Sequence, residues 1–206
     1  MARPRDKAET RKKEILENFY AVLAEEGLEG ASMAKIASRM GIHPSLIIHY
    51  FSNREEMVVE LVDFMLAKYE EAFLPRFREI DDPMERLHAI IDAIFGQDWA
   101  RLVDAGVFYA CYSLSLRNDR VRDSFKEMYT KLHEVLQKEI GDLMRMGMIV
   151  KADPGKLADL IISLLEGYDF YRRVMDDDAR FDELGRFLGE NALAILRVDR
   201  QGSGRV

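Results

Sequence analysis

The chain has 206 residues, of which 48% are hydrophobic and 33% are charged, and its net charge is −7 at pH 7. This composition is typical of a globular protein with a sizeable core and excludes a disordered or fibrous chain. The single cysteine, Cys111, excludes an intrachain disulfide and a cysteine-rich zinc site. Because no apolar run approaches the ~18 residues that a membrane span needs, we expect a cytoplasmic protein.

Charge is distributed unevenly along the chain. Residues 1–54 carry nine basic and seven acidic side chains, a net charge of +2, which leaves −9 for the remainder. An N-terminal basic arm is formed by Arg3, Arg5, Lys7, Arg11, Lys12 and Lys13. Because phosphate contacts supply much of the affinity for nucleic acid, a basic segment on an acidic body fits a DNA-binding head. The alternative is that these basic residues are solvated helix ends.

Three helices are predicted before residue 54. The apolar residues of 7–26 recur at helical spacing, and Gly27 ends this helix. Ser32 is a natural N-cap for a second helix, which stops at Gly41, a residue suited to a tight left-handed turn. The chain restarts at Pro44, which suits a first helical turn. Two short helices joined by a glycine turn make a helix-turn-helix, a DNA-binding motif.

The third of these helices is expected to contact bases. Serine and histidine can hydrogen-bond base edges, and Leu46 can touch a thymine methyl group. Side chains at helix termini and beside the groove are expected to contact phosphates. The expected DNA-binding residues are Ser32, Lys35, His43, Pro44, Ser45, Leu46, His49, Tyr50 and Arg54. The alternative is that the two histidines merely coat an exposed helix.

This region resembles the TetR family of one-component repressors. The similarity rests on Phe19, Glu26-Gly27, Gly30, Ser32, Ile36-Ala37, Met40-Gly41-Ile42, Ile47, Tyr50-Phe51, Asn53 to Glu56 and Val59. The resemblance implies that Tyr50 and Arg54 clamp the DNA backbone. One departure is Ile48, where the family usually carries an aromatic residue. Isoleucine cannot hydrogen-bond a phosphate, so this contact is not expected here.

Helical patterns continue to the end of the chain. They predict helices over residues 54–73, 83–96, 99–103, 107–116, 119–146 and 181–196. A further helix is predicted to start at 153–154 and to end before a break at 176–178. The apolar stripe of 54–73 can pack both on the DNA-binding region before it and on the helices after it, so this helix is the expected mechanical link between the two. Segment 107–116 is nearly all apolar and is expected inside the body. With the resemblance, this layout predicts an all-α protein with a DNA-binding domain (1–54), an effector-binding and dimerisation domain (55–200) and a flexible tail (201–206).

Aromatic and methionine residues of the body favour a small-molecule pocket. The expected effector-binding residues are Phe64, Phe95, Trp99, Phe108, Tyr109, Tyr112, Met128 and Tyr168. The resemblance also implies a pocket, since family members generally carry one, but no motif identifies its residues. The alternative is that aromatic residues at helical spacing form ordinary core.

The last two predicted helices offer a surface for a homodimer. The expected dimerisation residues are Leu160, Leu164, Gly167, Tyr171, Phe187, Asn191 and Ile195. Together with their symmetry mates they can form a four-helix interface. Residues 160–173 also resemble loosely the choline-responsive branch of the family, without assigning a ligand. The alternative is that these apolar faces pack within one chain.

An enzyme and a helical adaptor are the competing classes. Glu85 and His88 have the Glu-x-x-His spacing of a di-iron bundle, but the second copy that such a site requires is absent. His88 and His133 are therefore interpreted as surface or core residues, with no metal and no cofactor. An adaptor leaves the basic helix-turn-helix unexplained. The sequence thus predicts a homodimeric, non-enzymatic transcriptional repressor that a small-molecule effector releases from a palindromic DNA operator, although no residue distinguishes repression from activation.

Overall fold

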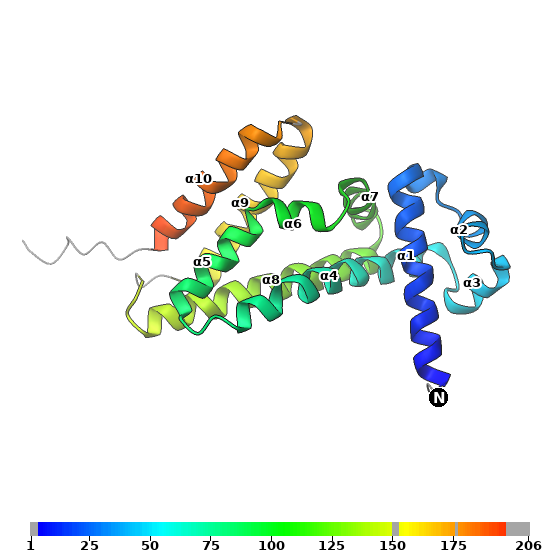
Figure 1. Cartoon of the computed structure of the whole chain (residues 1–206), viewed down its shortest axis with the longest axis horizontal. Coiled ribbons are helices and arrows are strands. Elements are labelled where there is room, and N and C mark those ends of the chain that lie inside the picture. Colours follow the sequence, from blue (N-terminus) through cyan, green and yellow to red (C-terminus); the bar gives the residue numbers. More distant parts are fainter. Residues whose placement is uncertain (1–3, 150–152, 176, 197–206) are drawn as a thin grey trace, which may run out of the picture. The chain divides into compact units, whose positions relative to one another are not determined.

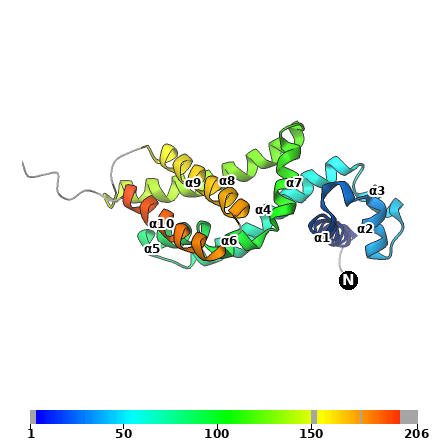
Figure 2. The same cartoon turned by 90° about the horizontal axis from the view of Figure 1, so that it is seen from above.

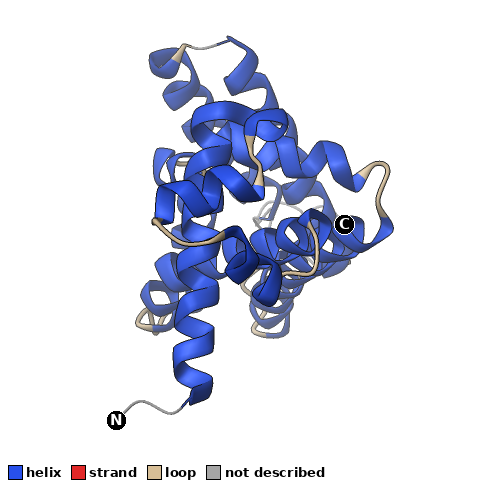
Figure 3. Cartoon of the chain, turned by 90° about the vertical axis from the view of Figure 1, so that its right-hand side faces the viewer, coloured by secondary structure: helices blue, strands red, loops and turns tan. Residues whose placement is uncertain are grey.

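The computed structural model describes residues 4–149, 153–175 and 177–196, and its elements are helices (Figures 1 and 3). In chain order they are α1 (Pro4–Gly30), α2 (Met33–Met40), α3 (Pro44–Tyr50), α4 (Arg54–Arg78), α5 (Pro83–Ile94), α6 (Gln97–Leu102), α7 (Ala105–Ser115), α8 (Asp119–Arg145), α9 (Pro154–Met175) and α10 (Asp178–Leu196). The predicted all-α fold is confirmed. Within the described ranges, no helix has the length and apolar character required to cross a bilayer. The predicted tail at 201–206 lies outside these ranges.

The chain divides into two compact units. The first, the head unit, contains the described residues up to Lys68 together with Val103–Met128. The second, the body unit, contains Tyr69–Leu102 and the described residues from Tyr129 onward. Helices α4 and α8 are long enough to contribute to both units. The contacts thus group the chain differently from a division by sequence order, since residues 103–128 join the head unit.

The head unit is built on α1, which is broken at Gly27 (φ 70°), where the sequence predicts its end. Phe19 of α1, Ile47 of α3 and Leu61 of α4 are fully buried. Helix α7 packs against α1, and Cys111 on α7 is also fully buried. The expectation that segment 107–116 lies inside the body is therefore wrong, because apolar composition indicates burial without naming the partner.

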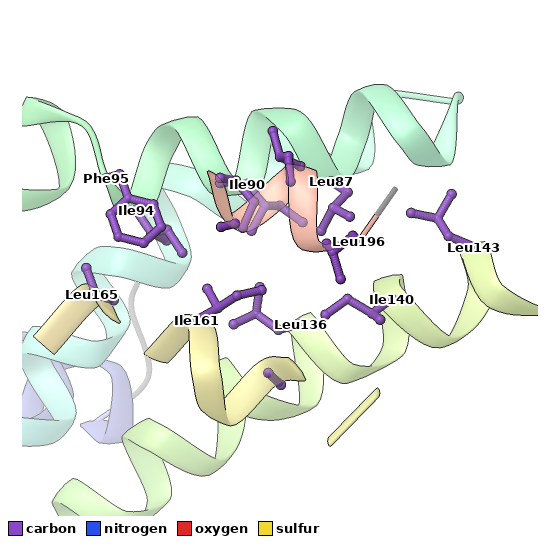
Figure 4. Close-up of a cluster of buried hydrophobic side chains, with 14 of the residues drawn as sticks. Leu87, Ile90, Ile94, Phe95, Leu136, Ile140, Leu143, Ile161, Leu165 and Leu196 are labelled. Carbon is purple, nitrogen blue, oxygen red and sulfur yellow. The ribbon is translucent and has the colours of Figure 1, made fainter. Parts of the chain in front are cut away.

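The body unit has its own apolar core among α5, α8, α9 and α10 (Figure 4). Leu87 and Ile91 of α5 and Leu136 of α8 are fully buried there. A charged pair lies beside this core, in which Arg86 Nε on α5 donates to Glu139 Oε2 on α8 at 2.8 Å. Such a pair, held between two helices, fixes which faces of α5 and α8 meet.

Candidate nucleic-acid interface

Helix α2 is bounded by the residues that the sequence singles out. Ser32 Oγ accepts a hydrogen bond from the Lys35 N–H at 3.3 Å, which caps the start of the helix. Gly41 ends it in the left-handed conformation, with φ 64° and ψ 32°. The next N–H, that of Ile42, donates to the Ala37 carbonyl at 3.0 Å and completes the turn. The predicted helix-turn-helix is thus formed by local hydrogen bonds.

Helix α3 begins with a second local cap. His43 Nδ1 accepts from the Ser45 N–H at 3.3 Å, and its contact with Ser45 Oγ is 2.8 Å. Pro44 occupies the first turn, as predicted. Because Ile47 is fully buried, it attaches the helix to the head core. The two polar groups that the sequence assigned to base contacts therefore also hold the start of α3 together.

The outward face of α3 combines polar and apolar side chains. Ser45 and His49 are exposed, whereas Pro44, Leu46 and Tyr50 are half-buried. Ile48 is 53% exposed and lies between Ser45 and His49 at helical spacing. In the sequence, Ile48 stands out only as a departure from the family and is not among the expected DNA contacts. An exposed isoleucine on this face was therefore a missed signal.

Arg54 begins α4 just after the helix-turn-helix. It is exposed, and none of the residues that the structure describes forms an ion pair or side-chain hydrogen bond with it. The turn before it is fixed, since Asn53 Oδ1 accepts from the Glu56 N–H at 2.9 Å, and Glu56 Oε2 accepts from the Ser52 N–H at 2.8 Å. Hydrogen bonding by Ser52, chiefly from its N–H, lowers the pKa of Glu56. The guanidinium thus stands on an ordered turn and remains available for an anion.

Other basic residues near this surface already have partners. Lys12 pairs with Glu60, and Lys35 pairs with Glu26. Arg11 pairs with Glu14 at 2.7 Å. Lys7 and Lys13 are exposed, whereas Arg3 and the side chain of Arg5 lie outside the part of the chain that is described. The basic arm therefore helps to attach α1 to α4 as well as to make the head positive.

The expected effector-binding residues fall into two groups. Phe64, Phe108, Tyr109, Tyr112 and Met128 belong to the head unit, and Phe95, Trp99 and Tyr168 belong to the body unit. In the head, Phe108 and Tyr112 pack edge-on against Phe125, with ring centroids 5.6 and 5.7 Å apart. This packing accounts for part of the aromatic clustering in the sequence.

Two of the body residues belong to the core. Phe95 and Tyr168 are both buried, with ring centroids 5.9 Å apart. The Tyr168 hydroxyl donates to the Phe181 carbonyl at 2.9 Å, and burial raises the pKa of this phenol. Trp99 is half-buried against Tyr69, at 4.4 Å between ring centroids. Their assignment to a pocket stays a prediction.

Helices α9 and α10 lie side by side in the body unit (Figures 1 and 2) and carry most of the expected dimerisation residues on exposed surface. Leu160, Tyr171, Phe187 and Ile195 are exposed large apolar residues, and Leu164 is half-buried. Gly167 has open space around it, and Asn191 donates to the Phe187 carbonyl at 2.7 Å. Three further apolar residues of α9, Phe170, Val174 and Met175, are also exposed and were not among the expected dimerisation residues. This wider set is named the α9–α10 face below.

The described residues offer little chemistry for catalysis. They contain no group of three or more histidine, cysteine or acidic side chains placed to hold a metal ion. His88 Nδ1 contacts the Met84 carbonyl at 2.7 Å, and His133 Nε2 contacts the Gly155 carbonyl at 3.2 Å. Burial raises the pKa of the Cys111 thiol to about 12, so it is protonated and a poor nucleophile at neutral pH.

Two family models match the chain. Residues 15–61 match the model of bacterial regulatory proteins of the tetR family. Residues 82–198, more than half of the chain, match the model of the tetracyclin repressor-like C-terminal domain. The first match contains the helix-turn-helix and Arg54, and the second contains α5 to α10.

Curated relatives are named as transcriptional regulators. The chain is 26% identical over 112 residues to the HTH-type transcriptional regulator BetI of Rhizobium meliloti, covering 54% of this chain and 55% of that protein. It is 34% identical over 99 residues to the HTH-type transcriptional repressor KstR2 of Mycobacterium tuberculosis, covering 46% and 48%. The chain thus spans about half the length of these curated relatives.

Solved structures have the same fold over nearly the whole chain. A TetR transcription regulator from Haloarcula marismortui is similar with a TM-score of 0.81 and 18% identity, covering 92% of this chain and 100% of that one. A putative transcriptional regulator from Saccharomonospora viridis, solved in complex with choline, has a TM-score of 0.78 and 17% identity, covering 92% and 99%. At such identities, the similarity concerns the fold.

Proposed function

Since this chain belongs to the TetR family of bacterial regulatory proteins, we propose that it is a DNA-binding transcriptional repressor that a small-molecule effector releases from a palindromic operator. One observation carries the proposal: the exposed face of α3, with Ser45, Ile48 and His49, lies on the same helix-turn-helix that Arg54 follows. The relatives BetI and KstR2 are named as a regulator and a repressor. A repressor of this kind acts in the cytoplasm, where its operator lies, and is not an enzyme.

The exposed face of α3 is proposed to contact bases, and the residues around it are proposed to contact phosphates. Ser45 and His49 supply hydrogen-bonding groups for base edges, and Ile48 supplies an apolar contact for a thymine methyl group. His43 and Leu46 flank this face at the start of the helix. Arg54 and Tyr50 bind phosphates and fix how α3 enters the major groove, with Ser32 and Lys35 at the start of α2 as further backbone contacts.

A homodimer places two α3 helices on one palindrome, with half-sites roughly 34 to 36 Å apart or a multiple of that spacing. The α9–α10 face is the proposed contact between the two copies, because it gathers large apolar side chains on the surface of two adjacent helices. We expect Phe187→Asp to convert the dimer to a monomer in light scattering. Met146→Asp is the matched control, because Met146 is 59% exposed and Phe187 is 58% exposed, but Met146 lies off this face. A monomeric wild-type protein at micromolar concentration contradicts the proposal.

The effector is proposed to bind among the aromatic residues that the sequence assigns to it, which lie in both units, and to favour an arrangement of the chain that does not fit the operator. By linkage, the effector then weakens DNA binding by the same factor by which DNA weakens effector binding. Choline is the first compound to test, because the similar Saccharomonospora viridis regulator holds it. Equal effector affinity with and without operator DNA contradicts this mechanism.

The deciding experiment is footprinting of the DNA upstream of the gene for this protein at two salt concentrations, followed by selection from random DNA if no site is protected. We expect a protected palindrome whose affinity falls with salt. Arg54→Gln should weaken binding and reduce the salt slope by about two for a dimer, one for each lost phosphate contact. Arg145→Gln in the body unit removes the same charge and should leave binding unchanged. No DNA binding in either format, or an unchanged slope for Arg54→Gln, contradicts the proposal.

A further inference from the structure

The head unit contains a hollow that the proposed function does not use. Its volume is about 200 Å³, and its lining residues are Leu28, Arg54, Glu55, Val58, Leu114, Asn118 and Val121. They come from the last turn of α1, the start of α4, the end of α7, and the start of α8 with the turn before it. The break at Gly27 gives the last turn of α1, with Leu28, its own direction. The hollow is thus built from four elements of one unit.

The walls of the hollow are mainly apolar. Leu28, Val58, Leu114 and Val121 contribute aliphatic side chains, and Val58 and Val121 are themselves 1% exposed. An apolar cavity of about 150 Å³ in a protein can hold benzene. A space of about 200 Å³ therefore accommodates a single aromatic ring and one small substituent.

The polar groups of the hollow favour a negative substituent. Arg54 has no ion-pair partner among the described residues, whereas Glu55, the one carboxylate of the lining, lies 3.7 Å from Arg120. Asn118 Oδ1 accepts from the Val121 N–H at 3.2 Å, which leaves its amide N–H groups as donors. Guanidinium and carboxylate form the strongest class of hydrogen bond between side chains. The lining is therefore complementary to an apolar body that ends in a carboxylate.

We propose that this hollow binds a small aromatic or aliphatic carboxylate of about the size of benzoate. The ring or chain lies against Leu28, Val58 and Leu114, and the carboxylate accepts hydrogen bonds from Arg54. None of the residues that line this hollow is among those proposed to bind the effector. A second ligand can therefore act on the protein independently of the first.

If the proposed function holds, a ligand in this hollow affects DNA binding directly. Arg54 cannot serve a bound carboxylate and a DNA phosphate equally well at the same time. Occupancy of the hollow therefore lowers operator affinity by competition at one side chain, without requiring a change in the body. A large excess of DNA should in turn displace the carboxylate.

The test is titration of the full chain with benzoate in the absence of DNA, followed by methyl NMR. We expect saturable shifts at Leu28, Val58, Leu114 and Val121. Benzyl alcohol and benzylamine, which keep the ring but lack the negative charge, should bind at least about tenfold more weakly. Shifts that do not saturate, equal affinity for all three compounds, or shifts elsewhere would overturn the proposal.

Three variants locate the site. Arg54→Gln should weaken benzoate binding at least about tenfold, whereas Arg39→Gln, which removes a paired charge from α2 in the same unit, should not. Leu114→Trp should fill the hollow and abolish binding, with its thermal unfolding compared to show that the chain is folded. Benzoate binding that survives both Arg54→Gln and Leu114→Trp rejects the site. Operator competition is measured separately, so saturable benzoate binding to a protein without DNA affinity rejects the proposed function and retains this site.

Discussion

The helix-turn-helix and the body core are stabilised in different ways. Helices α2 and α3 have 8 and 7 residues, and their ends are set by Ser32, Gly41 and His43 through hydrogen bonds between near neighbours in sequence. Helices α8 and α9 have 27 and 22 residues, and their positions depend on side chains far apart in sequence, such as Arg86 and Glu139. Short helices that carry function therefore rely on caps, whereas long helices rely on packing.

This difference predicts unequal costs of substitution. A cap contributes about 1 kcal/mol to the free energy of unfolding, because the backbone N–H that it bonds can hydrogen-bond to water when the cap is removed. A buried pair or a tightly packed helix crossing contributes more, because its loss leaves a charge unpaired or forces atoms apart. Breaking one contact of each kind tests the comparison.

The largest effect is expected from Glu139→Ala in the body unit. Glu139 and Arg86 have side-chain exposures of 9% and 20%. Removal of the carboxylate leaves a largely buried guanidinium whose remaining acceptor, among the described residues, is the Ile80 carbonyl. We expect a loss of about 3 to 5 kcal/mol in the free energy of unfolding, measured with urea. Glu134→Ala on the exposed side of α8 should change it by less than about 0.5 kcal/mol. Equal effects of the two variants would contradict the importance of the pair.

A smaller effect is expected where α10 passes close to its neighbours. A Cβ atom at Gly185 would lie 2.5 Å from the Phe95 carbonyl oxygen and 2.7 Å from the Tyr168 hydroxyl. Gly185→Ala should therefore cost about 1 to 3 kcal/mol in thermal or urea unfolding. At Gly189, one turn later on α10, the nearest atom is Ile91 Cγ2 at 3.5 Å, and Gly189→Ala should be neutral or stabilising by up to about 1 kcal/mol. A destabilised Gly189→Ala with an unaffected Gly185→Ala would reject this packing.

Local signals are the part of the fold that the sequence predicts well. Ser32, Gly41 and Pro44 act within a few residues of their own position, so their types alone place α2 and α3. The partner of α7 was not predictable in this way. Its apolar residues indicate burial, but the contact with α1 joins distant segments. The hydrogen bond from the Asp104 N–H to the Tyr20 hydroxyl, for example, joins residues 84 positions apart.

The candidate site shows the same limit. The sequence predicts that α3 is the recognition helix, and the exposure of Ser45 and His49 is compatible with that role. It does not reveal that Arg54 has no ion-pair partner among the described residues while Lys35 has one, because Glu26 reaches Lys35 only in the folded head. Likewise, Tyr168 has the composition of a pocket residue, but its hydroxyl is bonded to the Phe181 carbonyl.

The turn of the helix-turn-helix offers a smaller and more local test. Gly41 has φ 64°, a conformation that costs other residues about 1 kcal/mol, with asparagine the best tolerated. Gly41→Ala should therefore lower stability by about 1 kcal/mol and weaken operator binding, because it disturbs the turn that orients α3. Gly41→Asn is the control and should recover most of both, as measured by urea unfolding and DNA titration. If alanine and asparagine behave alike, the left-handed turn is not what positions α3.

The smallest expected effect concerns two carboxyl groups whose pKa values shift in opposite directions. Hydrogen bonds, chiefly from the Ser52 N–H, lower the pKa of Glu56 in the head unit, whereas burial raises the pKa of Glu166 in the body unit. Glu56 therefore favours folding above its unfolded pKa of 4.5, and this contribution is lost as the pH falls through its lower folded pKa. Glu166 favours folding below its unfolded pKa, and its contribution is lost as the pH rises through its higher folded pKa.

Carbon-detected NMR of the glutamate carboxyl groups measures both midpoints in one pH titration, with Glu56→Gln and Glu166→Gln assigning the two signals. The midpoint of Glu56 should lie below 4.5 and that of Glu166 above it. Replacement of Ser52 by proline removes the N–H that bonds Glu56 and should raise the midpoint of Glu56 alone. The Ser52–Glu56 bond joins residues four positions apart, whereas the burial of Glu166 requires the folded body unit. Mild urea should therefore move the Glu166 midpoint toward 4.5 as the body core loosens, before it moves the Glu56 midpoint. Midpoints that shift together under urea would contradict a difference between the locally bonded head turn and the packed body core.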